Sequence, residues 1–292
     1  MIESIGEIDS SSGEKMIRMW RVSVPAGHRP LQRHSHIQFE ITLVTGGRGE
    51  YTVGDNVFPM LPGDIFVFSS NECHSITNVD TCGLNIVNLH FEPRCLWGAS
   101  LDSLSGENVN LCFSHSAEFE NRIPASDAAP LASVFNAMKN ELSDKKPEYK
   151  LMTKSLLNQL LIMLVRDFGY ADSSLSVSRT HVHSIRKALA YIDSHISEKL
   201  TLGEISRIAG VSSTYFSALF KQISSITLWD YIFSKRIEKA IHLITESKSS
   251  DTMLEIALQC GFNNTANFNK IFRRKTGMTP TEYMKQDIKN IS

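Results

Sequence analysis

Three histidines and a glutamate in the N-terminal part have the residue types and spacing of a metal site. His34, His36 and Glu40 are all even-numbered, so their side chains share one face of a β-strand. His74 follows a turn-like stretch further along the chain. Three imidazoles and a carboxylate suit Zn²⁺, Ni²⁺, Fe²⁺ or Mn²⁺. Such a polar face could instead line a pocket for a small-molecule effector without any metal, and both interpretations stay open.

Other side chains extend this candidate effector site. Alternation along the segment 84–91 places Asn88 and His90 on one face, so His90 either lines a pocket or packs in its wall. Trp20 could stack on a sugar ring or belong to the core. The residues expected to bind the effector are Arg18, Trp20, His34, His36, Gln38, Glu40, His74 and His90.

Short apolar segments separated by turn residues predict the framework that holds these side chains. From about 16 to 113 they recur at spacings typical of an antiparallel barrel or jelly roll. From about 126 to 169 the apolar spacing changes to three and four residues, which predicts two antiparallel helices. We expect a homodimer through these helices. The apolar stripe that would serve it, or belong to the core instead, is Leu156, Leu160, Met163 and Leu164.

The C-terminal part contains an internal repeat. Sliding the segment 204–231 along the chain by 51 residues, then by 52, superposes Gly210 on Gly261 and Phe216 on Phe268. In each copy a short helix, a turn containing glycine and a second helix follow one another. This is the helix-turn-helix pattern, whose second helix enters the major groove of double-stranded DNA. We expect these second helices at about 213–224 and 265–276, joined by a helix from about 228 to 246.

The outer faces of these two helices predict the contacts with DNA. Asn269 has the amide that pairs with adenine, and Lys270 is a donor for guanine. The alternative is that both faces are simply solvated, but two copies in matching register favour DNA. The residues expected to contact DNA are Ser213, Thr214, Ser217, Ala218, Lys221, Thr265, Ala266, Asn269, Lys270, Arg273 and Arg274.

These motifs resemble those of a known family. The stretches LTLGEISRIAGVSSTYFSALFKQ, KRIEKAIHLI and EIALQCGFNNTANFNKIFRRKTGMTPTEY look like the DNA-binding domain of AraC/XylS transcriptional regulators. The family pattern in the second copy is met by Ile256, Ala257, Gly261, Phe262, Phe268, Phe272, Arg273, Gly277 and Pro280. In the first copy, Ser206 stands where the family usually has alanine. The resemblance implies an effector-responsive regulator of transcription.

The N-terminal histidines are similar to those of the cupin barrel. The residues that match its two motifs are His34, His36, Glu40 and Gly47, then His74 and Asn78. The glycine and proline that usually precede the last histidine of the cupin motif are missing before His74. In AraC-type regulators such a barrel commonly binds a small effector. The resemblance to this family points to a carbohydrate as that effector. We expect no required cofactor, with a divalent metal in the barrel as the alternative.

Charge divides the 292 residues into two parts. Residues 1–180 contain 15 basic and 21 acidic side chains, whereas residues 181–292 contain 15 basic and 10 acidic ones. Only the second part therefore suits a polyanion. We expect an α+β protein with a cupin-like barrel and two helices at 1–170, a linker at 171–180, and an all-helical domain with both helix-turn-helix motifs at 181–292.

Composition narrows the class of protein further. The five cysteines form no C-x-x-C pair, and no run of apolar residues is long enough to cross a membrane. The start of the chain lacks the pattern of a signal peptide, so we expect a cytoplasmic protein. The sequence predicts a sequence-specific transcription regulator, an activator and not an enzyme. The alternative is a metal-dependent cupin enzyme with an accessory helical domain.

Overall fold

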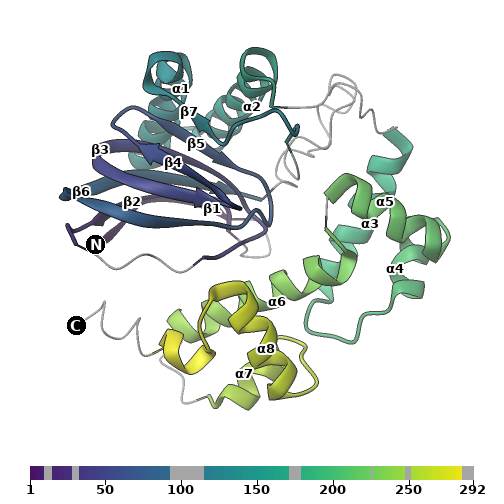
Figure 1. Cartoon of the computed structure of the whole chain (residues 1–292). Coiled ribbons are helices and arrows are strands. Elements are labelled where there is room, and N and C mark those ends of the chain that lie inside the picture. The colour runs from purple at the N-terminus through teal and green to yellow at the C-terminus, as the bar shows by residue number, and fades with distance from the viewer. Residues whose placement is uncertain are drawn as a thin grey trace. The chain divides into compact units, whose positions relative to one another are not determined.

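The computed structural model describes residues 1–9, 15–27, 33–92, 115–170, 179–224, 226–246 and 251–284 (Figure 1). The chain forms two compact units. The first comprises Met1–Gln32 and Gln38–Ser176, and the second comprises Arg33–Ile37 and Val177–Ser292. Positions 171–178 of the expected linker lie outside the described residues.

One antiparallel sheet forms the centre of the first unit. Its strands are β1 (Ile2–Asp9), β2 (Lys15–Val24), β3 (Phe39–Val53), β4 (Asn56–Met60), β5 (Ile65–Phe68), β6 (His74–Phe91) and β7 (Arg122–Ile123). They lie in the order β1-β2-β6-β3-β5-β7, and β4 pairs with β3 (Figure 1). The long strands β3 and β6 are neighbours, so the segments around Glu40 and His90 lie side by side although they are far apart in the sequence.

Alternation along the strands gives the sheet two different faces. Odd-numbered residues such as Ile41 on β3 and Leu89 on β6 are buried in a core with the helices α1 (Ala125–Asp144) and α2 (Tyr149–Phe168). Even-numbered residues such as Val44 and Ile86 belong to a second apolar cluster. Arg18, Glu40 and His90, three of the polar residues expected at the effector site, are on this even-numbered face, away from the two helices.

Asp64, which precedes β5, connects the sheet to the start of α1. The carboxylate is almost fully buried and accepts hydrogen bonds from the backbone N–H of Leu61 at 2.9 Å and of Ala125 at 3.0 Å. The guanidinium of Arg122 forms an ion pair with it at 2.9 Å. These contacts fix the entry into α1, which has no side-chain cap of its own.

The predicted α+β architecture is confirmed, but two strands are longer than the turn signals suggested. The adjacent Gly46 and Gly47 are local turn signals, but β3 continues through them with irregular register. Bulges let a strand absorb glycines without leaving the ladder. The sequence also gave no sign of β1, because the acidic N-terminal stretch has little apolar alternation and pairs only with β2.

Six helices are described in the second unit. They are α3 (Arg179–Ser194), α4 (Leu202–Ala209), α5 (Ser213–Ser224), α6 (Leu228–Glu246), α7 (Met253–Gln259) and α8 (Thr265–Thr276). Capping residues in the sequence define where several of these helices begin and end. Thr201 caps α4, Thr252 and Glu255 form a capping box at α7, and Asn264 caps α8. Gly210 and Gly277 end their helices in the left-handed conformation, as expected for C-terminal stops.

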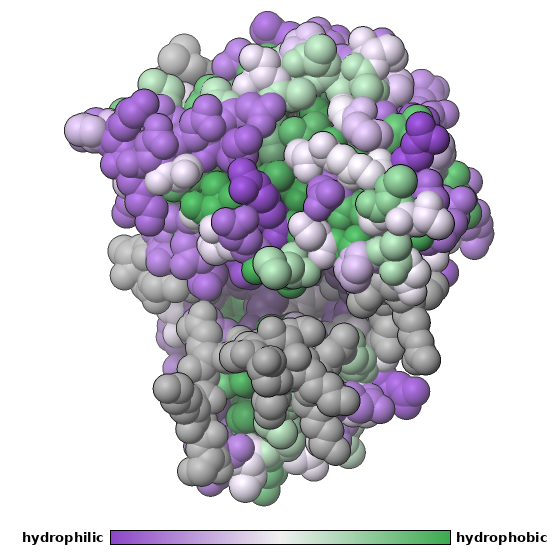
Figure 2. Space-filling view, turned by 90° about the vertical axis from the view of Figure 1, so that its left-hand side faces the viewer, coloured by the Kyte–Doolittle hydropathy of each residue, from purple (hydrophilic) through white to green (hydrophobic). Residues whose placement is uncertain are grey.

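Hydrophilic side chains gather over much of the face that Figure 2 shows, and hydrophobic side chains emerge between them in smaller groups. Single exposed apolar residues, such as Val57 and Leu61 in the first unit, are normal on protein surfaces. Among the described residues, no helix combines the length and the apolar character needed to cross a membrane.

The turn between β5 and β6 is held by a partly buried ion pair. Glu72 accepts hydrogen bonds from the backbone N–H of Ser69 at 2.9 Å and the side-chain amide of Asn121 at 2.9 Å. His115 Nε2 lies 3.0 Å from the same carboxylate. Burial alone would raise the pKa of Glu72, but these partners lower it below its ordinary value. Burial alone would lower the pKa of His115, but Glu72 raises it above the ordinary 6.5.

We expect this pair to make stability depend on pH. Because the pKa of His115 is raised on folding, its contribution is complete below the unfolded pKa and is lost as the pH rises through the folded value. The contribution of Glu72 is lost as the pH falls through its lowered pKa. His115→Gln should therefore flatten the alkaline side of a plot of melting temperature against pH, measured from about pH 5 to 9. His183→Gln, at an exposed histidine, is the control. An unchanged alkaline slope in His115→Gln would contradict the prediction.

Candidate functional site

Two rows of side chains cross the even-numbered face of the sheet. The register pairs Arg18 with His90 and His90 with Glu40, across β2, β6 and β3. One step along the strands, it pairs Trp20 with Asn88 and Asn88 with Thr42. Together these side chains form the cross-strand patch, which consists of Arg18, Trp20, Glu40, Thr42, Asn88 and His90.

Hydrogen bonds join the centre of the cross-strand patch. His90 Nε2 lies 2.7 Å from Glu40 Oε2, and the hydroxyl of Thr42 donates to Glu40 Oε1 at 2.7 Å. The same hydroxyl lies 3.1 Å from Asn88 Oδ1. Glu40 is only 2% exposed, so its charge is compensated by these groups rather than by water. The patch therefore contains donors and acceptors that are already oriented.

Aromatic rings border this polar centre. The rings of Trp20 and His90 are nearly perpendicular, with their centres 4.4 Å apart, and the Arg18 guanidinium lies 4.9 Å from the Trp20 ring centre. Such a combination of a flat indole and oriented polar groups is suited to a small molecule with one apolar and one hydroxylated face.

His74 approaches Glu40 from the start of β6. Its ring stacks on Phe68 at 4.1 Å, and Nδ1 lies 3.0 Å from the carbonyl oxygen of Glu72. Nε2 lies 3.3 Å from Glu40 Oε2. Burial lowers the pKa of His74, but the charge of Glu40 outweighs this effect and raises the pKa above its ordinary value. Both ring nitrogens face acceptors, which favours the protonated imidazole.

The donor set around Glu40 fits a divalent metal in its chemistry. The Nε2 atoms of His74 and His90 both approach Glu40 Oε2, at 3.3 Å and 2.7 Å. Two imidazole nitrogens and a carboxylate oxygen are ligands that borderline metals accept. A metal here would compete with protons for these ligand atoms. Glu40 and His74 of the predicted metal set are thus together, with His90 as a further donor.

The other residues predicted at this site are His34, His36 and Gln38. The rings of His34 and His36 are 5.8 Å apart, in the segment Arg33–Ile37 that belongs to the second unit. Their part in a metal or effector site stays a prediction. Gln38 donates from Nε2 to the buried Glu92 at 2.8 Å.

Sequence reasoning missed Thr42 as a member of the patch and did not include Asn88 among the predicted binding residues. Thr42 is fully buried, and Asn88 is 9% exposed. The signal was available for both, since each is an even-numbered neighbour of a predicted residue on the same strand.

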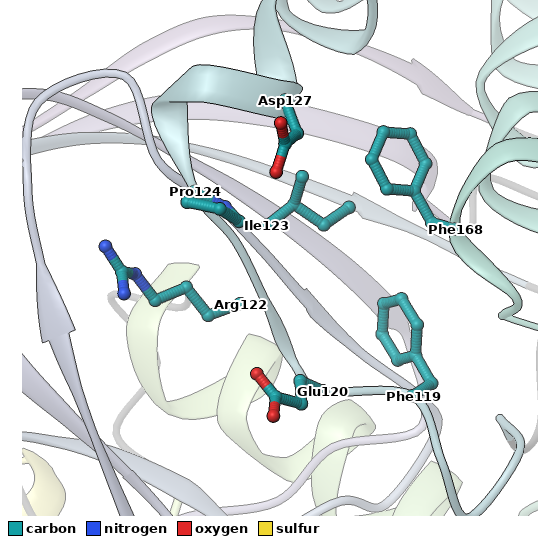
Figure 3. Close-up of a pocket in the computed structure, with 7 residues that line it drawn as sticks. All are labelled: Phe119, Glu120, Arg122, Ile123, Pro124, Asp127 and Phe168. Carbon is teal, nitrogen blue, oxygen red and sulfur yellow. The ribbon is translucent and has the colours of Figure 1, made fainter.

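A separate hollow of about 130 Å³ lies beside β7 and the start of α1. Figure 3 shows the rings of Phe119 and Phe168 near Ile123, with Arg122 pointing away from them. The Arg122 guanidinium is paired with Asp64. Sites for small molecules usually measure about 300 to 1,000 Å³, so this hollow is a weaker candidate than the cross-strand patch.

In the second unit, α5 and α8 carry the residues predicted to contact DNA. The exposed ones are Thr214, Ala218, Lys221, Ala266, Asn269, Lys270, Arg273 and Arg274, and the half-buried ones are Ser213, Ser217 and Thr265. The hydroxyl of Ser213 lies 2.8 Å from that of Ser206, so it also stabilises the first motif. Arg274 forms an ion pair with Asp230 at 3.0 Å, so DNA would have to compete for this guanidinium.

Tyr215 is an exposed aromatic residue on α5 that the sequence did not single out. Its hydroxyl lies 2.6 Å from His181 Nε2 on α3. Nothing in the repeat pattern predicted this contact, because His181 precedes the first copy.

Two protein-family models match this chain. The model of the AraC-like ligand binding domain matches residues 25–161, and a helix-turn-helix domain model matches residues 205–286. The chain belongs to the AraC family. It is a DNA-binding transcription regulator with an N-terminal ligand-binding domain.

Relatives in the AraC family extend over most of the chain. The probable transcriptional regulator LumQ of Photobacterium leiognathi is 26% identical over 250 residues, which are 86% of this chain and 90% of LumQ. The transcriptional activator RhaR of Escherichia coli K12 is 24% identical, over 86% of each chain. These relatives are regulators and not enzymes, which sets aside the interpretation as a cupin enzyme.

Solved structures show the same fold. ToxT of Vibrio cholerae matches with a TM-score of 0.61 at 14% identity, over 92% of this chain and 98% of ToxT. A ToxT structure bound to an unsaturated fatty acid matches with a TM-score of 0.56 at 11% identity, over 92% of this chain and 94% of ToxT.

Proposed function

We propose that this AraC-family member is a transcription activator whose N-terminal unit binds a carbohydrate at the cross-strand patch. The observation that carries the proposal is the hydrogen-bonded group of Glu40, Thr42, Asn88 and His90 beside Trp20. Sugar hydroxyls both donate and accept hydrogen bonds, and the faces of sugar rings stack on indole. The relative RhaR is named as a transcriptional activator, which supports activation rather than repression.

The charge of Glu40 favours a sugar over a fatty acid. ToxT has been solved with an unsaturated fatty acid. A fatty acid bound at the cross-strand patch would bring a second carboxylate into the surroundings of the buried Glu40. Two like charges brought together away from water repel each other strongly. A neutral polyol replaces the existing hydrogen bonds without adding charge.

A thermal-shift screen tests the proposal. A monosaccharide present at about 100 times its dissociation constant should stabilise the first unit by about 2.7 kcal/mol. The full chain should show this rise in melting temperature with a sugar but not with fatty acids. Glu40→Gln and Asn88→Ala should abolish it, whereas Asp80→Asn, which alters an exposed carboxylate, should retain it.

Other outcomes separate the alternatives. A shift with Zn²⁺, Ni²⁺, Fe²⁺ or Mn²⁺ alone, lost in Glu40→Gln, would favour the metal interpretation over the sugar. A shift with a fatty acid alone would overturn the carbohydrate. Reporter transcription that falls when the stabilising sugar is added would overturn the activator.

We also propose that α5 and α8 read DNA through their exposed faces. The second motif carries the hydrogen-bonding and cationic side chains Asn269, Lys270 and Arg273, all exposed. In the first motif, α5 presents hydroxyl and methyl groups, with the cation Lys221 in its last turn. The second motif should therefore supply most of the direct base recognition.

The proposed homodimer needs a different surface from the predicted stripe. Leu160 and Leu164 are fully buried in the core of their own unit, and Leu156 and Met163 pack against it. The exposed apolar residues of α2 are Leu151 (62%), Met152 (50%) and Ile162 (47%). Leu151 and Ile162 are eleven residues apart, about three helical turns, and so share one face.

We expect Leu151→Glu with Ile162→Glu to convert a dimer into a monomer. Opposed carboxylates in an apolar interface are desolvated and repel each other. Light scattering after size-exclusion chromatography measures the mass, and Ser155→Glu, an exposed residue of α2, is the milder comparison. A double variant that stays dimeric would place the interface elsewhere.

A further inference from the structure

A buried arginine lies at the middle of α6, the helix between the two helix-turn-helix motifs. Arg236 is only 7% exposed. Buried charges are rare in proteins unless hydrogen bonds compensate them. Burial lowers the pKa of Arg236, yet a guanidinium stays protonated in proteins. The position of this charge therefore needs an explanation.

The first set of contacts leads to the turn before the first motif. Arg236 Nε donates to the carbonyl oxygen of Ile196 at 2.9 Å, and Nη2 donates to that of Glu198 at 2.7 Å. Lys239, three residues further along α6, donates from Nζ to Ser197 Oγ at 2.6 Å. One face of α6 thus binds the turn 196–198, which leads into α4.

The second set of contacts leads to the turn inside the second motif. The guanidinium carbon lies 5.9 Å from the centre of the Phe262 ring. Gly261 has φ +83°, and a Cβ built there would lie 2.9 Å from Arg236 Cζ and 2.8 Å from the carbonyl oxygen of Ile196. The turn between α7 and α8 therefore packs directly against the guanidinium and against the turn 196–198.

We propose that Arg236 is a positioning residue that fixes the two helix-turn-helix motifs relative to each other, and thereby sets the spacing between the two DNA segments that the chain reads. The proposal rests on DNA reading by both motifs. Two recognition helices held rigidly must enter successive major-groove segments about one helical turn apart. A planar guanidinium that binds two carbonyl oxygens and lies over an aromatic ring has a defined orientation, which the single ammonium of lysine does not reproduce.

Spacer-dependent DNA binding tests this role. The full wild-type chain selects a duplex from a random library, and footprinting defines two protected segments for each bound subunit. Duplexes with one base pair inserted or deleted between the segments are then compared with the selected one. We expect wild type to discriminate at least about tenfold against the altered spacers, as for a misplaced specific contact.

Arg236→Lys should bring this discrimination close to onefold, because loosely joined motifs adjust to either spacing. Lys239→Met removes only the contact with Ser197 and should reduce the discrimination partly. The control, Lys199→Met, changes an exposed residue beside the same turn and should behave as wild type. Circular dichroism and melting curves report whether each variant folds.

A merely structural role gives a different result. General destabilisation lowers the affinity for every spacer by the same factor, so an unchanged ratio in both Arg236→Lys and Lys239→Met would overturn the proposal. If Arg236→Lys fails to fold, the ratio in Lys239→Met decides alone. A wild-type chain that protects a single segment would contradict reading by both motifs, and with it this role for Arg236.

Discussion

Asn269→Ala is expected to weaken binding of the full chain to its selected DNA by about 1–3 kcal/mol and to relax the choice of base at one position. Asn269 is exposed on α8, whose N-terminus is fixed by the Asn264 cap. An asparagine amide can form two hydrogen bonds with adenine, and alanine forms none. The loss should therefore depend strongly on the sequence of the DNA.

Arg273→Gln should behave differently at the end of the same helix. Arg273 is exposed in the last turn of α8, where we expect it to meet phosphates rather than bases. Loss of one phosphate contact weakens binding almost equally for all sequences and reduces the slope of log K against log salt by about one. Fluorescence anisotropy from about 50 to 200 mM salt measures both quantities.

Lys187→Gln is the charge-matched control for Arg273→Gln, since it removes an exposed cation of α3 outside both motifs. Selected and scrambled duplexes distinguish the two roles. If Asn269→Ala lost affinity equally for both duplexes, the residue would not read a base. If Arg273→Gln left the salt slope unchanged, it would not contact a phosphate.

Local chemistry explains why the helical unit could be predicted so closely. The Thr201 and Asn264 caps and the Gly277 stop each involve residues within a few positions of one another. Such signals are legible in one sequence. The contact between Arg236 and the turn 196–198 cannot be read in this way, because it joins α6 to a turn about 40 positions earlier in the chain.

In the sheet, by contrast, long-range strand pairing overrides local sequence signals. Gly46 and Gly47 are strong local turn signals, yet pairing of β3 with β6 carries the strand through them. Alternation correctly placed Glu40 and His90 on a face, but the register that makes them partners depends on the whole ladder. Apolar periodicity also could not distinguish core from interface in α2, since Leu160 has the spacing that either role requires.

Phe268→Ala is expected to lower the free energy of unfolding of the second unit by about 3–5 kcal/mol. Phe268 is fully buried, and its ring meets Phe262 at 5.2 Å and Phe272 at 5.6 Å. Alanine would leave a cavity between the turn of the second motif and α8. Domains are usually stable by only about 5–15 kcal/mol, so this loss is a large fraction of the total.

Hydrogen exchange of the full chain gives the local measurement that a protein of two units requires. Amides of α8 should exchange much faster in Phe268→Ala, while those of β3 and β6 in the first unit should keep their rates. The exposed neighbour Asn267→Ala is the control and should alter neither. Because α8 carries Asn269, Lys270 and Arg273, the variant should also lose specific DNA binding on warming, before the first unit melts. Unchanged exchange in α8 would mean that the surrounding helices collapse onto the cavity, and that the second motif does not depend on this ring.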